Sequence, residues 1–483
     1  MTQSPTDCNS PSSRRFRIEA DSLGEMQVPA EALWGAQTQR AVENFPISGL
    51  TLPHCFIRAL AHIKRACAQA NAELGYLSPT LADAIVKACD EVIAGELDRH
   101  FPIDVFQTGS GTSTNMNVNE VLARRAGQLL SGSSGHPHPN DHVNMSQSSN
   151  DVIPTAIHVA LTLALRERLF PALQALEAAL GEKAREFDPV VKTGRTHLQD
   201  ATPIRMGQVF GGFQAQAQQS LARAERALSA LRPLALGGTA VGTGVNCPVG
   251  FPERAIAHLN AALDTEFVEA ADHVEANAAR DALVEVSGLL KTVAVSLHKV
   301  ANDIRWMGSG PRNGLGELRL PAVQPGSSIM PGKVNPVLAE ALIMVCAQVI
   351  GFDAANTLAG LGGAFELNLM MPLLAHNTLT AVELLANATT VFTERCVAGL
   401  EVDAEVCRTS VRRNLALATA LAPALGYARA AEIAKEAGAS GRTVREVALA
   451  WEVLPVAELD ALLDPLRMTE PGLLEPDKPD PAL

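Results

Sequence analysis

A mainly α fold is predicted by three features of the 483-residue sequence. Hydrophobic residues make up 47% of the chain, which is typical of a globular protein and not of a disordered one. Aromatic residues make up only 4%, whereas Ala and Leu recur in long runs, and this balance favours helices packed closely through small side chains. From Leu283 to Ile304, apolar residues recur at spacings of three and four, as on one face of a helix.

The chain begins with a polar segment and a first predicted domain. Residues 1–15 are expected to form a disordered tail, and their paired arginines have no apolar segment behind them, so no secretory or twin-arginine signal is predicted. Residues 16–145 form the predicted N-terminal domain, with helices from Phe56 to Leu74 and from Leu81 to Ala94. The loop "SGSSGHPHPND" is rich in helix breakers and ends this domain.

Residues 146–404 form the predicted central domain, a bundle of long helices that carries the loop "PGSSIMPGKVNP". One helix has a regular apolar seam, which consists of Leu283, Val286, Leu290, Val293, Leu297, Val300 and Ile304. Leu289 and Val295 lie off the seam, so we expect this helix to contact several neighbours, including those of other subunits. The segment "VLAEALIMVCAQVIGF" contains Glu340 and Gln348 and is predicted to be a helix buried inside protein, not a membrane span.

Residues 405–483 form the predicted C-terminal domain, which is small and helical. The segment "LGYARAAEIAKEAGASGRTVREVAL" is typical of a helix, a glycine turn and a second helix. A Pro-rich tail follows it. The sequence therefore predicts a long central bundle flanked by two smaller, mostly helical domains.

Charge and cysteine content restrict the possible partners. A formal charge of −13 argues against nucleic-acid and anionic-membrane surfaces, because both require a basic face. An anionic small molecule remains possible if its site is locally positive. The eight cysteines include no CxxC pair, which indicates free thiols in a reducing compartment and hence a cytoplasmic location.

Four loops are rich in small polar residues and are the candidate binding segments. They are "QTGSGTSTNMNVNE", "HPNDHVNMSQSSND", "GRTHLQDATP" and "PGSSIMPGKVNP". Hydroxyl, amide and backbone N–H donors of this kind make anion-binding surfaces without many formal charges. Any single loop could instead be an ordinary turn or helix cap, but four together favour a site for a carboxylate.

Two other kinds of site are disfavoured by spacing. Gly326 and Gly332 enclose five residues where a phosphate-binding loop has four, and Val334 follows Lys333 where a magnesium-binding Ser or Thr is required. The motif "HPHPNDH" brings His136, His138 and His142 together, but its prolines prevent a one-face helical arrangement. We therefore expect a solvated histidine loop and no metal site.

An ordered set of motifs covers essentially the whole chain after Phe16. The motifs are "LWGAQTQRAVENFPI", "QTGSGTSTNMNVNEVLA", "HPNDHVNMSQSSND", "GRTHLQDATP", "LALGGTAVGTGVN", "GSGPRNGLGEL", "GSSIMPGKVNP" and "AFELN". Together they resemble the class II, iron-free fumarases of the fumarase/aspartase superfamily. The resemblance implies a lyase that reversibly adds water to the dicarboxylate fumarate to give L-malate through an aci-carboxylate carbanion. It also implies no cofactor and a homotetramer whose sites are shared between subunits.

The resemblance assigns roles to residues of these loops. Ser327 corresponds to the base that acts at carbon, and His197 pairs with Glu340 to activate water. Lys333 and Asn335 correspond to the groups that stabilise the developing negative charge. The remaining substrate contacts are expected from Ser110, Gly111, Thr112, Ser148, Ser149, Asn150 and Thr196, with a possible secondary carboxylate site at His138, Pro139, Asn140 and Asp141.

Two alternatives and three departures accompany the resemblance. An ammonia-lyase acting on aspartate is disfavoured because aspartases carry glutamine at the position of His197. A catalytically silent scaffold is disfavoured because the proposed acid and base residues are all present. Gly135 stands where many fumarases have arginine, Met371 where several have lysine, and Phe106 where tryptophan is common. These departures place the secondary site in doubt and leave room for a substituted fumarate.

Overall fold

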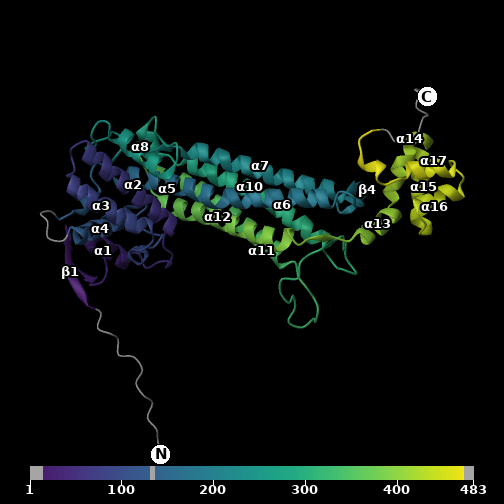
Figure 1. Cartoon of the computed structure of the whole chain (residues 1–483), viewed down its shortest axis with the longest axis horizontal. Helices are drawn as coiled ribbons and strands as arrows, with labels where there is room; N and C mark the ends of the chain where they lie inside the picture. The colour runs from purple at the N-terminus through teal and green to yellow at the C-terminus, as the bar shows by residue number, and fades with distance from the viewer. Residues whose placement is uncertain (1–14, 131–135, 473–483) are drawn as a thin grey trace, which may run out of the picture. The chain divides into compact units, whose positions relative to one another are not determined.

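The computed structural model describes residues 15–130 and 136–472, and the predicted mainly α fold is confirmed (Figure 1). Residues 1–14, 131–135 and 473–483 lie outside the described part. They include all of the predicted tail except Arg15, and they include Gly135 and the end of the Pro-rich segment. The chain forms two compact units. Unit 1 comprises residues up to 169 with 223–291 and 348–384, and unit 2 comprises 170–222, 292–347 and residues from 385 onward. The domain boundaries at 145 and 404 stay a prediction.

Unit 1 is mostly helical with short two-stranded sheets. Its elements are β1 (Phe16–Asp21), β2 (Gly24–Pro29), α1 (Ala36–Asn44), α2 (His54–Glu73), α3 (Pro79–Ile93), η1 (Asp98–His100), α4 (Thr112–Leu129), η2 (Pro139–Val143), α5 (Ser149–Ala164), η3 (Leu165–Leu169), β5 (Pro233–Leu234), α8 (Phe251–Leu263), β6 (Val268–Glu269), α9 (His273–Ala278), β8 (Gly363–Ala364) and β9 (Leu367–Asn368).

Unit 2 combines one hairpin with helices. Its elements are α6 (Phe170–Glu186), β3 (Val191–Thr196), β4 (Gln199–Arg205), β7 (Leu318–Arg319), η4 (Thr393–Val397), β10 (Glu401–Val402), α13 (Ala404–Arg413), η5 (Leu415–Leu421), α14 (Ala422–Leu425), α15 (Tyr427–Ser440), α16 (Val444–Ala450), α17 (Val456–Leu462) and η6 (Arg467–Thr469). Four long helices contribute residues to both units: α7 (Met206–Leu231), α10 (Asp281–Met307), α11 (Val337–Gly360) and α12 (Met371–Phe392).

The core of unit 1 is built around α2. This helix packs against α3, α5 and α8, and α3 packs against α4 (Figure 1). Phe56, Leu60 and Ile63 of α2 have no exposed surface, as expected for the apolar face of a packed helix. The two helices predicted in this part of the sequence, from Phe56 and from Leu81, are confirmed by α2 and α3.

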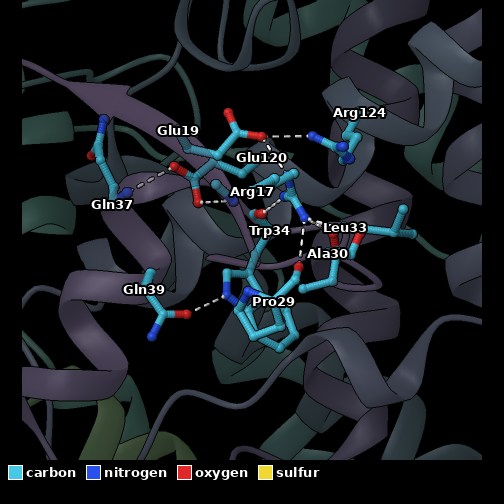
Figure 2. A network of polar contacts seen from close by, with 12 residues as sticks. Arg17, Glu19, Pro29, Ala30, Leu33, Trp34, Gln37, Gln39, Glu120 and Arg124 are labelled. Carbon is cyan, nitrogen blue, oxygen red and sulfur yellow. Dashed lines mark hydrogen bonds and ion pairs between the residues drawn. The ribbon is translucent and has the colours of Figure 1, made fainter. Parts of the chain in front are cut away.

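A polar network fastens α1 to α4 (Figure 2). Glu120 on α4 is buried, and its carboxylate accepts the backbone N–H groups of Gly35, Gln37 and Thr38 at 2.9–3.1 Å. The first N–H groups of a helix have no partner within the helix, so this carboxylate caps the N-terminus of α1. Beside it, Arg17 donates to the carbonyl of Trp34 and also pairs with Glu19 (Figure 2).

The C-terminal helices of unit 2 have a separate apolar core. Ile433 of α15, Val447 of α16 and Leu459 of α17 are fully buried against one another and their neighbours. Gly441 follows α15 with φ +70°, a left-handed conformation that favours glycine at the end of a helix. The predicted helix, glycine turn and helix are therefore confirmed.

The two long apolar helices expected in the bundle behave differently. Every member of the predicted α10 seam is at most 2% exposed, which confirms the seam. In α11, by contrast, one stripe is buried, formed by Ala339, Leu342, Cys346, Val349, Asp353, Asn356 and Ala359. Met344 and Leu358 are each 66% exposed, so the prediction of a helix buried inside protein is wrong for the single chain.

By length and composition alone, α11 is the one helix among the described residues that could cross a membrane. This is weak support for a membrane span, because core helices of soluble proteins meet the same criteria. The buried stripe of α11 contains Asp353 and Asn356. Asp353 forms an ion pair with Lys291 of α10, and Asn356 donates to Ser287 on the same helix. These polar contacts fix one face of α11 against protein.

Candidate active site

The loop "PGSSIMPGKVNP" of unit 2 lies between β7 and α11 and holds three predicted residues in one hydrogen-bonded turn. The Ser327 Oγ accepts the backbone N–H groups of Ile329 at 3.2 Å and Met330 at 2.8 Å. Two N–H donors aimed at a hydroxyl oxygen stabilise negative charge on that oxygen. These donors come from the backbone two and three residues after Ser327.

Lys333 and Asn335 complete this turn. Lys333 Nζ donates to Asn335 Oδ1 at 2.6 Å, and Asn335 Nδ2 donates to the carbonyl of Gly326. The backbone closes the loop, because Gly326 N donates to the Lys333 carbonyl at 2.9 Å. A Cβ atom at Gly326 would lie 2.3 Å from that carbonyl oxygen, so only glycine allows this approach. The cationic and amide groups are thus held on the same loop as Ser327.

His197 lies at the tip of the β3–β4 hairpin in unit 2. His197 and Leu198 both have positive φ values, of 57° and 59°, and both side chains are exposed. Non-glycine residues seldom adopt this conformation, and it is common at functional turns. Thr196, the last residue of β3, is also exposed. The hairpin therefore presents the predicted acid and base histidine outward from the unit.

A buried charge cluster supports the hairpin. Glu317 is fully buried and pairs with Arg195 of β3 at 2.7 Å and with Lys192 at 3.1 Å. Burial lowers the pKa of Lys192, and the Glu317 carboxylate opposes that shift. A buried carboxylate held by two cations is costly to break, so this cluster fixes the strand that leads to His197.

Glu340 stands in the first turn of α11 and is exposed. The pairing of Glu340 with His197 implies a carboxylate buried beside an imidazole, and such burial is not found in the single chain. The reason is geometric, because Glu340 lies one residue away from the buried stripe of α11 at Ala339. Within the described part of the chain, His197 and Glu340 are both exposed side chains.

In unit 1, the candidate binding loop "QTGSGTSTNMNVNE", the first substrate loop of the proposal below, runs into the N-terminus of α4. Ser110 is buried, and its Oγ lies 2.8 Å from Thr112 Oγ1. Gly111 has φ +74°, and a Cβ atom there would lie 2.9 Å from the Ile153 side chain of α5. Met371, which departs from the family pattern, is buried, and its N–H donates to the Gly109 carbonyl at 3.1 Å. Its contact with this loop therefore involves the backbone.

The second loop of unit 1 ends at the N-terminus of α5. Ser148 caps this helix together with Asp151 in a capping box. Asp151 is fully buried and also accepts the N–H groups of Gly237 and Thr239, both at 3.0 Å. Burial raises the pKa of Asp151, and these hydrogen bonds oppose the shift. Ser148, Ser149 and Asn150 are therefore presented from one rigid corner.

The predicted histidine loop is confirmed as a polar turn. His138 caps η2, and its Nδ1 lies 3.1 Å from the Asp141 carboxylate. His136, His138 and Asn140 are exposed. They line a cavity of about 770 Å³ together with Arg124 of α4 and Glu19 of β1. Gly135 lies outside the described residues.

The predicted residues thus form two groups. Unit 1 holds Ser110, Gly111, Thr112, Ser148, Ser149 and Asn150, and unit 2 holds Thr196, His197, Ser327, Lys333, Asn335 and Glu340. Each group contains hydroxyl and amide donors that could meet a carboxylate, and the second also contains the candidate acid and base and the cation Lys333. This division is compatible with a site assembled from several loops.

Comparison with known proteins decides the family. A family model described as lyase matches residues 24–351, and one described as fumarase C C-terminus matches residues 417–470. A protein named fumarate hydratase class II from Halobacterium salinarum is 56% identical over 96% of this chain and 99% of its own length. The chain belongs to the class II fumarate hydratase family.

Other class II fumarate hydratases agree over nearly the whole length. One from Mycobacterium tuberculosis is 52% identical over 96% of this chain and 98% of its own. The crystal structure of a class II fumarase from Schistosoma mansoni aligns with a TM-score of 0.92 and 41% identity, covering 94% of this chain and 99% of that one. The mainly α fold is thus that of class II fumarate hydratases.

Several buried polar residues were not predicted from the sequence. Lys64 and Asp151 are fully buried beside the second loop of unit 1, and Glu317 is fully buried beside the His197 hairpin. For Lys64 the sequence gives no distinguishing signal, because Arg65 follows it directly and residue types alone do not show which of the two cations is buried. For Glu317 and Asp151 no local pattern distinguishes a buried carboxylate from a surface one.

Proposed function

We propose that this chain reversibly hydrates fumarate to L-malate through a carbanion, with Ser327 as the base at carbon. The observation that carries this proposal is the pair of N–H donors from Ile329 and Met330 to the Ser327 Oγ. A neutral hydroxyl is a poor base, and donors of this kind favour its oxyanion. In the malate-to-fumarate direction, Ser327 takes the proton from the carbon next to a carboxylate.

The resulting negative charge spreads into that carboxylate as an aci-carboxylate. Lys333 supplies a positive charge and Asn335 supplies an amide donor from the same loop as the base. Because charge accumulates only as the proton leaves, these groups stabilise the transition state more than bound malate. This is how the loop accelerates the step.

His197 acts on the hydroxyl group of malate that leaves as water. It donates a proton to the departing hydroxyl group, so that water leaves as the carbon–oxygen bond breaks, and it takes the proton back in the reverse direction. Glu340 accepts a hydrogen bond from the imidazole and so fixes its orientation and tautomer. Since both residues are exposed in the single chain, we propose that the pair forms between subunits.

The second carboxylate of the substrate is bound by donors of the two loops in unit 1, namely Ser110, Gly111, Thr112, Ser148, Ser149 and Asn150, with Thr196 from the hairpin. Ser110 and Thr112 already lie within hydrogen-bond distance of each other. Neutral donors at a helix start bind a carboxylate without a formal charge.

We further propose a homotetramer with sites shared between subunits and a cytoplasmic location. Support for the assembly comes from α11, in which Met344, Ile350 and Leu358 are at least 40% exposed. A long helix with apolar side chains in water is typical of a subunit interface. In addition, Ile329, beside Ser327, is 83% exposed. Cover from another subunit would remove these side chains from water.

The possible secondary site at His138, Pro139, Asn140 and Asp141 gains one cation. Arg124 of α4 lines the same cavity, although its Nη1 already donates to Glu19 at 2.7 Å (Figure 2). We propose that a carboxylate effector would compete with Glu19 for this guanidinium. Binding there is therefore expected to be weak, because the ligand must replace an existing ion pair.

The test of the function is ultraviolet absorbance of fumarate when the purified, metal-stripped protein receives L-malate, with L-aspartate in a parallel cuvette. We expect fumarate from malate alone. Fumarate from aspartate would contradict the role of His197 and favour an ammonia-lyase. No fumarate from either would contradict the proposed function and favour a substituted dicarboxylate or a scaffold.

A further inference from the structure

Lys64 lies in the middle of α2 and has no exposed surface. Its Nζ donates to Asn144 Oδ1 at 2.8 Å and to Gln147 Oε1 at 2.9 Å. Burying an ammonium group is unfavourable unless polar groups replace its water, and a hydrophobic side chain would fill the same place at lower cost. Since both hydrogen-bond partners are neutral amides, this buried cation calls for an explanation other than a simple ion pair.

Both partners of Lys64 belong to the turn between η2 and α5. Asn144 Oδ1 also accepts Nδ2 of Asn115 and of Asn119 on α4, each at 3.2 Å. Asn144 Nδ2 in turn donates to the Gln147 carbonyl at 3.1 Å. Donors from two helices therefore converge on one amide oxygen, and Lys64 is the only charged donor among the three.

This turn leads directly into the second substrate loop. Asn115, one of the donors to Asn144, also donates to Ser149 Oγ at 2.9 Å. Ser148 N donates to Asp151 Oδ1 at 2.9 Å, and Asp151 is a buried carboxylate that interacts electrostatically with Lys64. A buried cation and a buried anion thus fix the two ends of a short segment, from Asn144 to Asp151.

We propose that Lys64 is a positioning residue for the substrate, whose ammonium group fixes the turn Asn144–Gln147 so that Ser148, Ser149 and Asn150 meet a carboxylate. The inference rests on the proposed function of these three residues. Charge-assisted hydrogen bonds are stronger and shorter than neutral ones, so a cation holds two amide side chains more rigidly than a neutral donor would. A buried positive charge also attracts an anion strongly, because little water screens it.

The protonation state of Lys64 suits this role. Burial lowers the pKa of Lys64 to about 8, and the neighbouring Asp151 carboxylate opposes the shift. Near neutral pH the group therefore still carries its charge. The groups that act on it electrostatically are Asp151 of α5, Cys67 of its own helix and Cys89 of α3.

Lys64→Met tests the proposal, because methionine has a similar length and no N–H donor. We expect KM for fumarate to rise about tenfold or more while kcat changes by less than about threefold, since a mispositioned carboxylate site loses mainly uniform binding. Replacing a lysine with a purely structural role would change the stability of the protein and leave KM unchanged.

A matched control is Lys183→Met, because Lys183 is also buried and donates to the Leu400 carbonyl at 2.9 Å. The control should keep both constants within about twofold of those of the unmodified protein.

Gln147→Leu is the second variant, and it keeps the cation while removing one of its partners. We expect KM to rise several-fold, and the double variant with Lys64→Met to be no worse than Lys64→Met alone, because both changes release the same turn. If Lys64→Met fails to fold, Gln147→Leu decides, and an unchanged KM in Gln147→Leu would overturn the proposal.

Hydrogen exchange separates this inference from the proposed function. In Lys64→Met the amides of residues 143–150 should exchange faster, whereas those of α8 should not. If the unmodified protein does not hydrate fumarate, the proposed function is overturned. The hydrogen-exchange result alone then decides whether Lys64 fixes the turn. Normal KM and normal exchange in a folded Lys64→Met would overturn the positioning role, whatever the unmodified protein does.

Discussion

At the scale of single residues, Ser327 combines a local motif with a contact that the motif does not reveal. Its place in "GSSIMPGKVNP" is evident from the sequence. The donation from the N–H groups of Ile329 and Met330 depends on the fold of the loop. The two together support the proposed role of the Ser327 hydroxyl as the base.

Ser327→Ala is expected to reduce kcat by about a thousandfold or more, because no other oxygen receives these two N–H groups. The hydroxyl is small and only partly buried, so the thermal unfolding temperature should stay within about 2 °C of that of the unmodified protein. Steady-state kinetics and calorimetry check both values. Ser328→Ala, the neighbouring exposed serine, is the matched control, and a larger loss there would move the base to Ser328.

His197→Asn is expected to lower kcat by about a hundredfold or more, since a positioned acid or base contributes that much. The pH dependence of kcat/KM should also lose the limb that reports the imidazole. Measurement of the full pH profile for malate dehydration checks this. An unchanged profile would remove His197 from the proton path.

His158 provides a prediction about pH and stability. Burial lowers its pKa to about 4, and its Nδ1 contacts the carbonyl of Pro233 at 2.9 Å. Between pH 6.5 and 4 the unfolded chain binds a proton at His158 that the folded chain does not, so stability falls as the pH falls through this window.

The comparison of pH 7.5 with pH 5 in urea unfolding should show this effect. His158→Gln keeps a donor for the carbonyl. From pH 7.5 to pH 5, the free energy of unfolding of this variant should fall by about 1–2 kcal/mol less than that of the unmodified protein. His54 is exposed and pairs with Asp98, so His54→Gln is the control. Equal losses in the His158→Gln variant and the unmodified protein would contradict the assignment.

At the scale of elements, the structure shows that helix ends are held by carboxylates from other segments. Glu120 on α4 caps α1 across more than 80 residues of sequence. The sequence predicts local caps well, such as Ser148 with Asp151, because both residues lie within three positions of each other. It does not predict a cap from a distant helix, since no spacing encodes that contact.

Glu120→Gln is expected to lower the free energy of unfolding by about 2 kcal/mol, because the amide has one acceptor oxygen and its NH₂ group would face N–H donors of α1. Chemical denaturation of the protein, monitored by a local probe at Trp34 of unit 1, measures this change in the free energy of unfolding. Glu43→Gln, a change at an exposed residue of α1, should cost less than about 0.5 kcal/mol. Equal effects of the two changes would contradict the capping role.

The apolar elements were predictable to different degrees. The prediction of the α10 seam was correct at every position, because a 3.5-residue period of apolar residues can be recognised within the helix itself. For α11 the sequence is apolar all around, so no periodicity indicates which face is buried. Only packing distinguishes the stripe that contains Leu342 from the exposed side that contains Met344.

At the scale of the whole molecule, the exposed side of α11 yields a prediction about assembly. Met344→Glu is expected to dissociate the proposed tetramer and to reduce activity by about a hundredfold or more, because a buried charge without a partner disfavours the interface. Light scattering coupled to size exclusion measures the mass. Leu23→Glu, at an exposed apolar residue of the β1–β2 turn, should leave mass and activity unchanged. A tetramer in the Met344→Glu variant would place the interface elsewhere.

The sequence by itself determined the mainly α class, the α10 seam, the family resemblance and the loops that carry the candidate acid, base and carboxylate groups. These features are local, because each depends on residue types at short spacings. Only the tertiary structure decided that Ser327 receives two N–H donors, that Glu340 is exposed in the single chain, and that Lys64 is buried against the second substrate loop. Each of these depends on how a loop folds back or on which segments pack together, and no local spacing encodes such contacts.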